Sequence, residues 1–209
     1  MKIAIIGAGN VGTALGNAWT KRGHEIVFGV RDPESAKARS LTKQFPNAHL
    51  LLNGAAAQKA EFIVLATPWQ STEEAVRACG DLQGKTLIDC TNPLKSDFSG
   101  LEVGFSTSGA ELISEWAHGA DVFKAMNQIG ARLMDTPSFG GIIKPVMFVC
   151  GEGVQKASVI LIIDQLGFTV VDAGDLKTAR LLEPYGMLWI HLAFTQKVPG
   201  DFAFALLAK

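Results

Sequence analysis

The chain has little cysteine, one tyrosine and almost no net charge. Its 19 lysine and arginine residues nearly balance its 20 acidic residues, so the formal net charge is −1. This balance gives no basic surface for a nucleic acid or a membrane. The three cysteines, Cys79, Cys90 and Cys150, have no paired spacing, which argues against a disulfide framework or a zinc site. We therefore expect no metal site, no nucleic-acid or membrane partner, and a protein of the reducing cytoplasm.

Long hydrophobic segments are also missing. The longest apolar runs, such as 159–163 and 187–194, are far shorter than the ~20 residues that a membrane-spanning helix needs. The apolar start of the chain is too short for a signal peptide, and the glycine motif that follows it explains it.

The familiar acid–base constellations of dehydrogenases are not present either. A short-chain dehydrogenase needs a lysine four residues after its catalytic tyrosine, but Trp189 stands at that place after Tyr185. The scattered cysteines do not offer the ligands of a zinc alcohol dehydrogenase. Too few residues follow the last expected strand for the large helical domain of a hydroxyacid dehydrogenase. His191 is the one histidine that we consider for the pocket, and a packing role is favoured over a catalytic one. We therefore expect no catalytic side chain.

The most informative segment is the first twelve residues. An apolar run, residues 3–6, leads directly into Gly7, Gly9 and Gly12 in G-x-G-x-x-G spacing, with Ala8 in the same turn and a helical pattern afterwards. A strand, a tight turn and a helix N-terminus in this order bind the pyrophosphate of a dinucleotide. Free N–H groups and the helix dipole favour the anion there.

Short apolar strands and helical segments alternate along the rest of the chain. This pattern predicts a doubly wound Rossmann-type α/β fold, with a mostly parallel sheet of about eight strands and a small C-terminal helical extension. We divide the chain into an NADP-binding Rossmann domain, 1–139, and a small α/β extension, 140–209, on the same body. The expected strands are 2–7, 25–30, 49–52, 61–67, 85–90, 121–125, 145–151 and 168–172. The expected helices are 11–22, 35–44, 71–79, 106–117, 154–166 and 176–195.

Two local features modify this scheme. Residues 126–144 lack helical periodicity, so we expect one strand after Ala125 to be antiparallel. Pro184 lies inside the last expected helix and should kink or split it.

The end of the second strand bears on the choice of dinucleotide. NAD-binding units usually place a carboxylate there for the ribose 2′-hydroxyl, but this strand ends in Val30 and is followed by Arg31. Arg31 offers a planar donor fork to a 2′-phosphate, and Ser35 can support it at the next helix start, so we predict NADP(H). The alternatives are that Arg31 is a solvated turn residue and that Asp32 favours NAD.

Polar or ring-shaped residues follow three further strands. Ligands of open α/β sheets bind outside the carboxyl ends of strands, so these residues are candidates for the cofactor wall. The alternative is ordinary turn chemistry, because Thr-Pro and Asn-Pro often begin turns. The candidates are Thr67, Pro68, Trp69, Asn92, Pro93 and Asn127.

The motifs also resemble a known family, the NADPH-dependent reductases of the 5-deazaflavin coenzyme (factor 420). The similar segments extend over nearly the whole chain. Residues 124–127, Lys-Ala-Met-Asn, look closer to the cytosolic oxidoreductase domain of six-transmembrane ferrireductases, which passes hydride from NADPH to a flavin. The family has Gly-Ser-Arg at the end of the second strand, whereas this chain has Val30 in the place of the serine. The segments are residues 6–12, 23–33, 66–69, 123–127, 149–151, 172–174 and 179–183.

The resemblance implies a function and a set of contacts. NADPH is bound by Gly9, Asn10 and Val11 at the pyrophosphate and by Arg31 at the 2′-phosphate. The protein is expected to be a homodimer whose C-terminal part shapes the pocket for a small-molecule redox acceptor. We therefore expect an NADP-dependent oxidoreductase that transfers hydride to a deazaflavin or flavin-type acceptor. The alternatives are a reductase of a small carbonyl or imine and a non-catalytic NADP(H) sensor. The remaining wall residues of the family match Thr67, Pro68, Trp69, Asn92 and Asn127.

Overall fold

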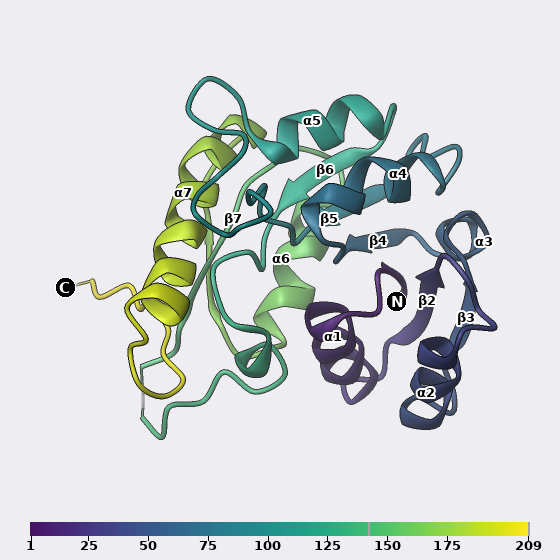
Figure 1. The fold of residues 1–209 in the computed structure, drawn as a ribbon, viewed down its shortest axis with the longest axis horizontal. Coiled ribbons are helices and arrows are strands. Elements are labelled where there is room, and N and C mark those ends of the chain that lie inside the picture. The colour runs from purple at the N-terminus through teal and green to yellow at the C-terminus, as the bar shows by residue number, and fades with distance from the viewer. Residues whose placement is uncertain (142, 209) are drawn as a thin grey trace.

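A six-stranded parallel sheet forms the centre of the protein. The computed structural model describes residues 1–141 and 143–208. The strand order is β3-β2-β1-β4-β5-β6, so the direction of winding reverses between β1 and β4. Figure 1 shows strands β2 to β6 of this sheet. Because β1 and β4 pair in parallel, their carboxyl ends lie together at the point where sheets of this kind bind ligands. The strands are β1 (Lys2–Ile6), β2 (Glu25–Val30), β3 (His49–Leu52), β4 (Phe62–Leu65), β5 (Thr86–Asp89) and β6 (Asp121–Lys124).

Helices cover both faces of this sheet. Strand residues that alternate in sequence belong to two separate cores, because successive side chains of a strand point to opposite faces. Ile3 and Ile5 pack with α1, α2 and α6, whereas Ala4 and Ile6 pack with α3, α4 and α5. The helices are α1 (Asn10–Thr20), α2 (Ala36–Gln44), α3 (Asn53–Gln58), α4 (Thr72–Arg77), α5 (Gly109–Trp116), α6 (Lys156–Asp164) and α7 (Ala179–Ile190). The doubly wound Rossmann-type prediction is therefore confirmed.

The last two strands form a sheet of their own. β7 (Val146–Val149) and β8 (Thr169–Asp172) are parallel to each other, with α6 between them in the chain. The antiparallel strand that we expected is reduced to one bridge, in which Lys124 and Cys150 exchange backbone hydrogen bonds of 2.8 and 3.1 Å. The bridge cannot extend into a ladder, because Met126 (φ 63°) and Gly151 (φ 135°) leave the extended conformation on either side of it.

The sequence patterns mispredicted two helical segments. The short helix α3 was not expected, because its alanine-rich sequence has no recognisable apolar period. The last helix is not split at Pro184 but is continuous from Ala179 to Ile190, and it continues as a π-helical turn over His191–Thr195. Tertiary bonds hold the turn around the proline: the Leu182 carbonyl accepts a hydrogen bond from Asn127, and the Glu183 carboxylate is fixed by two backbone amides.

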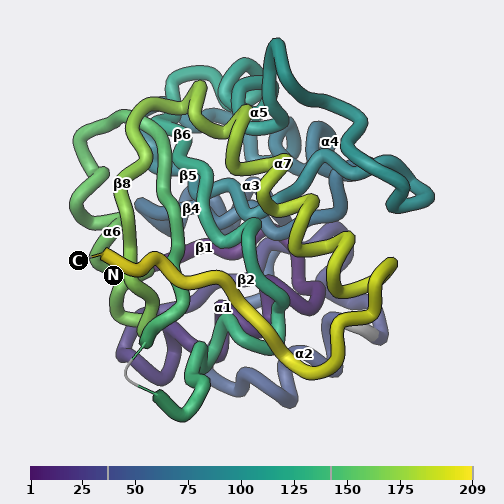
Figure 2. The backbone as a smooth tube through the Cα atoms, turned by 90° about the vertical axis from the view of Figure 1, so that its left-hand side faces the viewer, coloured from purple at the N-terminus to yellow at the C-terminus, as the bar shows by residue number. Residues whose placement is uncertain are grey.

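The C-terminal tail after α7 lies against β7 and α7. The Val146 amide donates to the Phe204 carbonyl at 2.9 Å, and the Trp189 indole donates to the Phe202 carbonyl at 3.0 Å. Figure 2 shows the tail crossing this side of the molecule after α7. Among the described residues, no helix combines the length and hydrophobicity that crossing a bilayer requires.

Candidate functional site

The turn between β1 and α1 requires glycine at two positions for close packing and leaves open space at a third. Gly7 has a φ of 104°, and a Cβ at this position would lie 2.6 Å from the Ala66 carbonyl oxygen. A Cβ at Gly12 would overlap the Gly7 carbonyl oxygen, so α1 can approach the strand only because this residue is glycine. A Cβ at Gly9, in contrast, would meet no atom within 4 Å. The motif thus brings the helix close to the sheet and keeps the space in front of Gly9 open.

The N-terminus of α1 has no side chain to satisfy it. Its N-cap residue is Gly9, and its first turn contains no acidic residue. The predicted residues Asn10, Val11 and Gly12 form this first turn. The first amides of a helix lack intrahelical partners, and the helix dipole places positive charge there. This end of α1 is therefore suited to an anion.

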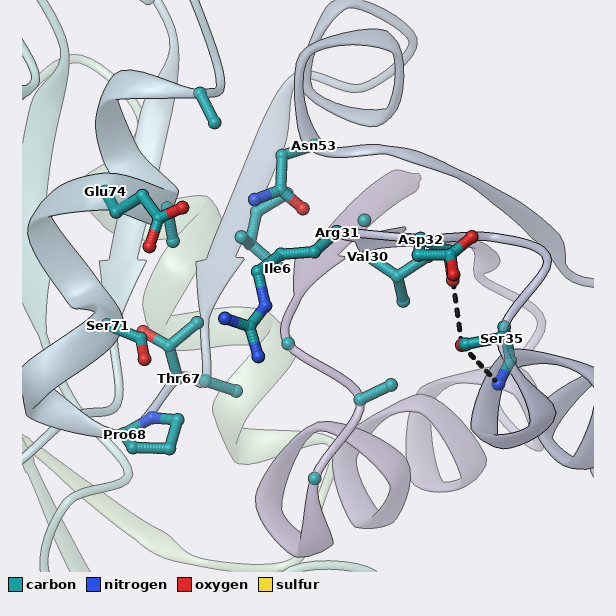
Figure 3. A pocket seen from close by; sticks show the side chains of 18 residues that line it. Ile6, Val30, Arg31, Asp32, Ser35, Asn53, Thr67, Pro68, Ser71 and Glu74 are labelled. Atoms are coloured by element: carbon teal, nitrogen blue, oxygen red, sulfur yellow. Dashed lines mark hydrogen bonds between the residues drawn. The ribbon is translucent and has the colours of Figure 1, made fainter.

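A cavity of about 470 Å³ opens beside this turn. Figure 3 shows one wall formed by residues after β1 and β2 and a facing wall formed by residues after β4 and on α4. The cavity thus spans the switch point of the sheet. Seven of the predicted site residues line it: Gly7, Ala8, Gly9, Arg31, Ser35, Thr67 and Pro68.

Arg31 and Asp32 leave the end of β2 in different directions. Figure 3 shows the Arg31 guanidinium reaching across the cavity towards the wall of Thr67, whereas Asp32 lies on the side of Ser35. The Asp32 carboxylate accepts a hydrogen bond from the Glu34 amide at 2.9 Å, which fixes it in the local turn. In the described part of the chain, no carboxylate lies within ion-pair distance of Arg31. Arg31 is therefore the cation that the cavity offers to a ligand.

Ser35 has a structural function at the edge of the same cavity. Its hydroxyl donates to the Asp32 carbonyl at 2.8 Å and accepts from the Ala38 amide at 3.2 Å, so it caps α2. These bonds use the hydroxyl locally, which leaves Arg31 as the stronger candidate for a phosphate contact.

The remaining predicted residues lie outside the cavity lining. Trp69 packs against Trp116 in a tilted arrangement with a ring-centroid distance of 5.6 Å, and Pro93 packs close to the start of α5 at Gly109. Both residues thus have packing contacts within the protein, and their place in the cofactor wall stays a prediction.

Asn92 and Asn127 are brought together at the ends of β5 and β6. Asn92 Nδ2 donates to the Asn127 carbonyl at 2.9 Å, and Asn127 Nδ2 donates to Asn92 Oδ1 at 3.1 Å and to the Leu182 carbonyl at 2.9 Å. Met126, just before Asn127, is fully buried with a φ of 63°. A bulky residue in the left-handed region is strained, and such strain is concentrated at functional sites. The mutual hydrogen bonds thus join the two predicted asparagines into one unit, which lies next to this strained residue.

A buried ionic cluster beneath these asparagines was not predicted. Lys124 Nζ lies 2.8 Å from Asp89 Oδ2, 2.8 Å from Glu183 Oε1 and 2.7 Å from the Thr91 carbonyl oxygen. The three charged side chains are fully buried. Burial disfavours the ammonium, but the Asp89 and Glu183 carboxylates outweigh this effect and raise the pKa of Lys124 above its usual value. A signal was present in the sequence, because Asp89 and Lys124 are charged residues that directly follow apolar residues in their strands, and the structure pairs them in the sheet.

Glu183 connects this cluster to two helices. It lies on α7, and its carboxylate accepts hydrogen bonds from the amides of Gly109 and Ala110 at the start of α5. The ionic cluster therefore fixes α7 against the strand ends at which Asn92 and Asn127 lie.

The sequence analysis also missed three polar residues of the cavity lining. Asn53, Ser71 and Glu74 line the cavity and are labelled in Figure 3. They lie on α3 and around the start of α4, elements whose position relative to β1 depends on the whole sheet. Tyr185 and His191 are not among the residues that line this cavity.

Comparison with known proteins shows the family of the chain. The family described as coenzyme F420-dependent NADP oxidoreductase matches residues 2–93. A protein from Arthrobacter sp. FB24, named as a candidate F420-dependent NADP reductase, is 32% identical, with a TM-score of 0.90 and 100% of both chains covered. An Aspergillus terreus imine reductase shares the fold at 24% identity and a TM-score of 0.69, over 93% of this chain and 63% of its own.

A curated relative matches about half of the chain. The glycerol-3-phosphate dehydrogenase [NAD(P)+] of Chlorobium luteolum (strain DSM 273 / BCRC 81028 / 2530) is 30% identical over an alignment of 129 residues, which covers 55% of this chain. The chain spans about a third of the length of this relative, since the match covers 36% of it. With the glycine turn, the cavity and the full-length likeness, these matches show that the chain is an NAD(P)-dependent oxidoreductase and belongs to the coenzyme F420-dependent NADP oxidoreductase family.

Proposed function

We propose that the protein transfers hydride between NADP(H), held in the cavity described above, and a deazaflavin or flavin-type acceptor. The observation that carries this proposal is the Arg31 guanidinium, which reaches into the cavity without a carboxylate partner in the described ranges. A 2′-phosphate supplies the missing counter-charge, and the planar guanidinium suits it.

The residues of the glycine turn fit the rest of the dinucleotide. The uncapped start of α1 offers amides to the pyrophosphate, and the open space in front of Gly9 lets phosphate oxygens approach the backbone. Thr67 and Pro68 form the facing wall. When bound, the nicotinamide supplies the hydride, and this chain supplies its binding and orientation.

The strand ends beyond the cavity support a ring-shaped acceptor. Asn92 and Asn127 offer neutral amides there, and the nearby ammonium of Lys124 is buried with all three of its donors engaged. Hydride transfer between stacked rings depends mainly on proximity and orientation. A carbonyl acceptor needs a positioned proton donor in addition. These strand ends therefore favour a deazaflavin or flavin over a carbonyl.

One observation supports the alternative, a reductase of a small carbonyl or imine. Tyr185 lies half-buried on α7 between Phe148 and Phe204, with ring-centroid distances of 5.7 and 4.9 Å. Burial raises the pKa of Tyr185, so its hydroxyl remains protonated at neutral pH, as a proton donor requires.

We also propose that the protein is a cytoplasmic homodimer. Leu181 and Leu188 lie seven residues apart on α7 and are 70% and 48% exposed, and Phe194 in the following turn is 70% exposed. Residues at this spacing share one face of a helix, and a second copy of the chain would cover such an apolar face. The three buried cysteines are all free, which agrees with a reducing compartment.

A kinetic experiment distinguishes these functions. Purified protein is mixed with NADPH and, separately, with the deazaflavin coenzyme, riboflavin mononucleotide and a panel of carbonyls and imines, while oxidation of NADPH is recorded. We expect turnover with the deazaflavin or flavin, and Tyr185→Phe retains it. Turnover only with carbonyls or imines, abolished in Tyr185→Phe, would establish the alternative. Binding of NADPH without turnover of any acceptor would indicate the sensor.

A further inference from the structure

One end of the cavity, where Asn53 and Glu74 lie, has room for a flat ring, and the planar Arg31 guanidinium reaches into the same cavity (Figure 3). The lining also includes three small side chains, Ala38 of α2 and Ala75 and Ala78 of α4. A nucleobase can bury its faces against such surfaces, and a guanidinium stacks well on a ring.

Two polar side chains lie at this end of the cavity, and they have opposite hydrogen-bonding character. Asn53, the first residue of α3, is 6% exposed, and its Oδ1 is buried without a hydrogen-bond partner. Figure 3 shows its amide nitrogen on the side of Glu74, which projects from α4. The ion pair of α4 is made by the preceding residue, Glu73, with Arg77 at 2.7 Å, and does not involve Glu74. This end of the cavity therefore presents an amide donor, Asn53 Nδ2, on the side of a carboxylate acceptor, Glu74.

This pair matches one edge of adenine. Adenine has an amino group, a donor, next to a ring nitrogen that accepts. Asn and Asp or Glu side chains read bases by this complementarity of donors and acceptors. Hypoxanthine has the reverse order, because a carbonyl oxygen replaces the amino group and the neighbouring ring nitrogen carries a proton.

We propose that Asn53 and Glu74 select the adenine base of the dinucleotide, with Glu74 accepting from the amino group and Asn53 donating to the adjacent ring nitrogen. This inference rests on the proposed binding of NADP(H) in the cavity. It adds a base-specific contact to a site that otherwise recognises phosphates and a ribose.

The test compares binding of NADPH with that of its hypoxanthine analogue, deamino-NADPH, by titration of nicotinamide fluorescence. The unmutated protein should bind NADPH about tenfold more tightly, because deamino-NADPH leaves a donor facing a donor and an acceptor facing an acceptor. Glu74 is exposed, so Glu74→Gln should fold normally, and it should reduce the ratio of the two dissociation constants to about threefold or less.

A double substitution reverses the donor–acceptor order. Asn53→Asp with Glu74→Gln keeps the total charge and nearly the volume of the pair, but it places the acceptor at position 53 and a donor at position 74. The double variant should bind deamino-NADPH more tightly than NADPH. Ser71→Ala is the matched control, because Ser71 lines the same cavity near Thr67 and Pro68, away from Asn53 (Figure 3). It should leave the ratio unchanged.

The outcomes separate the two levels of the proposal. If neither NADPH nor deamino-NADPH binds the unmutated protein, the proposed cofactor site is wrong. If both bind equally well, or if Glu74→Gln leaves a tenfold preference intact, the cofactor site stands and base selection by this pair is overturned. If the double variant does not fold, Glu74→Gln alone decides.

Discussion

Removing the buried ammonium of Lys124 should destabilise the protein strongly. Lys124→Met keeps the length and apolar stem of the side chain but deletes three contacts of 2.7 to 2.8 Å. Asp89 and Glu183 then face each other without a counter-charge in a region that solvent does not reach. Breaking a buried ion pair from one side costs about 3–5 kcal/mol, against a total stability of about 5–15 kcal/mol for a typical protein.

The contribution of Lys124 to the stability of the folded protein depends on pH. The pKa of Lys124 is raised in the folded protein, so its stabilising contribution is fully present below the ordinary lysine pKa and is lost as the pH rises through the folded value. The variant lacks this contribution at neutral pH.

Urea unfolding, followed by circular dichroism, measures the effect. We expect a lower midpoint with an unchanged dependence on urea concentration, because the surface exposed on unfolding is the same. Lys156→Met is the matched control. Lys156 also contacts two carboxylates, Glu152 and Asp172, each at 2.9 Å, but its side chain is 18% exposed and those partners are 66% and 45% exposed. Such a pair contributes about 1 kcal/mol or less. A loss in Lys124→Met no larger than in Lys156→Met would refute the reasoning.

The site itself gives further predictions. Arg31→Ala should weaken the binding of NADPH about 10- to 100-fold while changing the binding of NADH little, because only NADPH carries the 2′-phosphate; calorimetry measures both, and equal losses would contradict the assignment. Gly12→Ala should lower the stability by about 1–3 kcal/mol, because its Cβ overlaps the Gly7 carbonyl oxygen. Gly9→Ala, where a Cβ meets nothing within 4 Å, should leave the melting temperature unchanged but weaken the binding of NADPH. A destabilised Gly9→Ala together with a stable Gly12→Ala would disprove the account of the turn.

Much of the central sheet could be predicted from the sequence, because its strands are buried on both faces. Such strands read as short apolar runs, as at Ile3–Ile6, and the glycine spacing fixes the first turn. The separate β7–β8 sheet could not be predicted in this way, because it depends on the positive φ angles of Met126 and Gly151. Met126 gives no sequence signal for that conformation, since left-handed backbone favours glycine or asparagine.

The candidate site was predictable to a similar extent. Residues that contact the cavity through their place at the ends of β1, β2 and β4 could be named, since chain position alone puts them there. Asn53 and Glu74 could not, because they reach the cavity from helices packed across the sheet. Trp69 was predicted as part of the cofactor wall. Its contact with Trp116 could not be predicted, because the two residues lie far apart in the sequence.

The central claim is that the cavity between β1, β2 and β4 binds NADP(H) through the start of α1 and through Arg31. Isothermal titration calorimetry of the unmutated protein with NADPH and with NADH tests it most directly. The account predicts saturable binding of NADPH at one site per chain and markedly weaker binding of NADH. Absence of heat with saturating NADPH, or equal affinity for both dinucleotides, would contradict it.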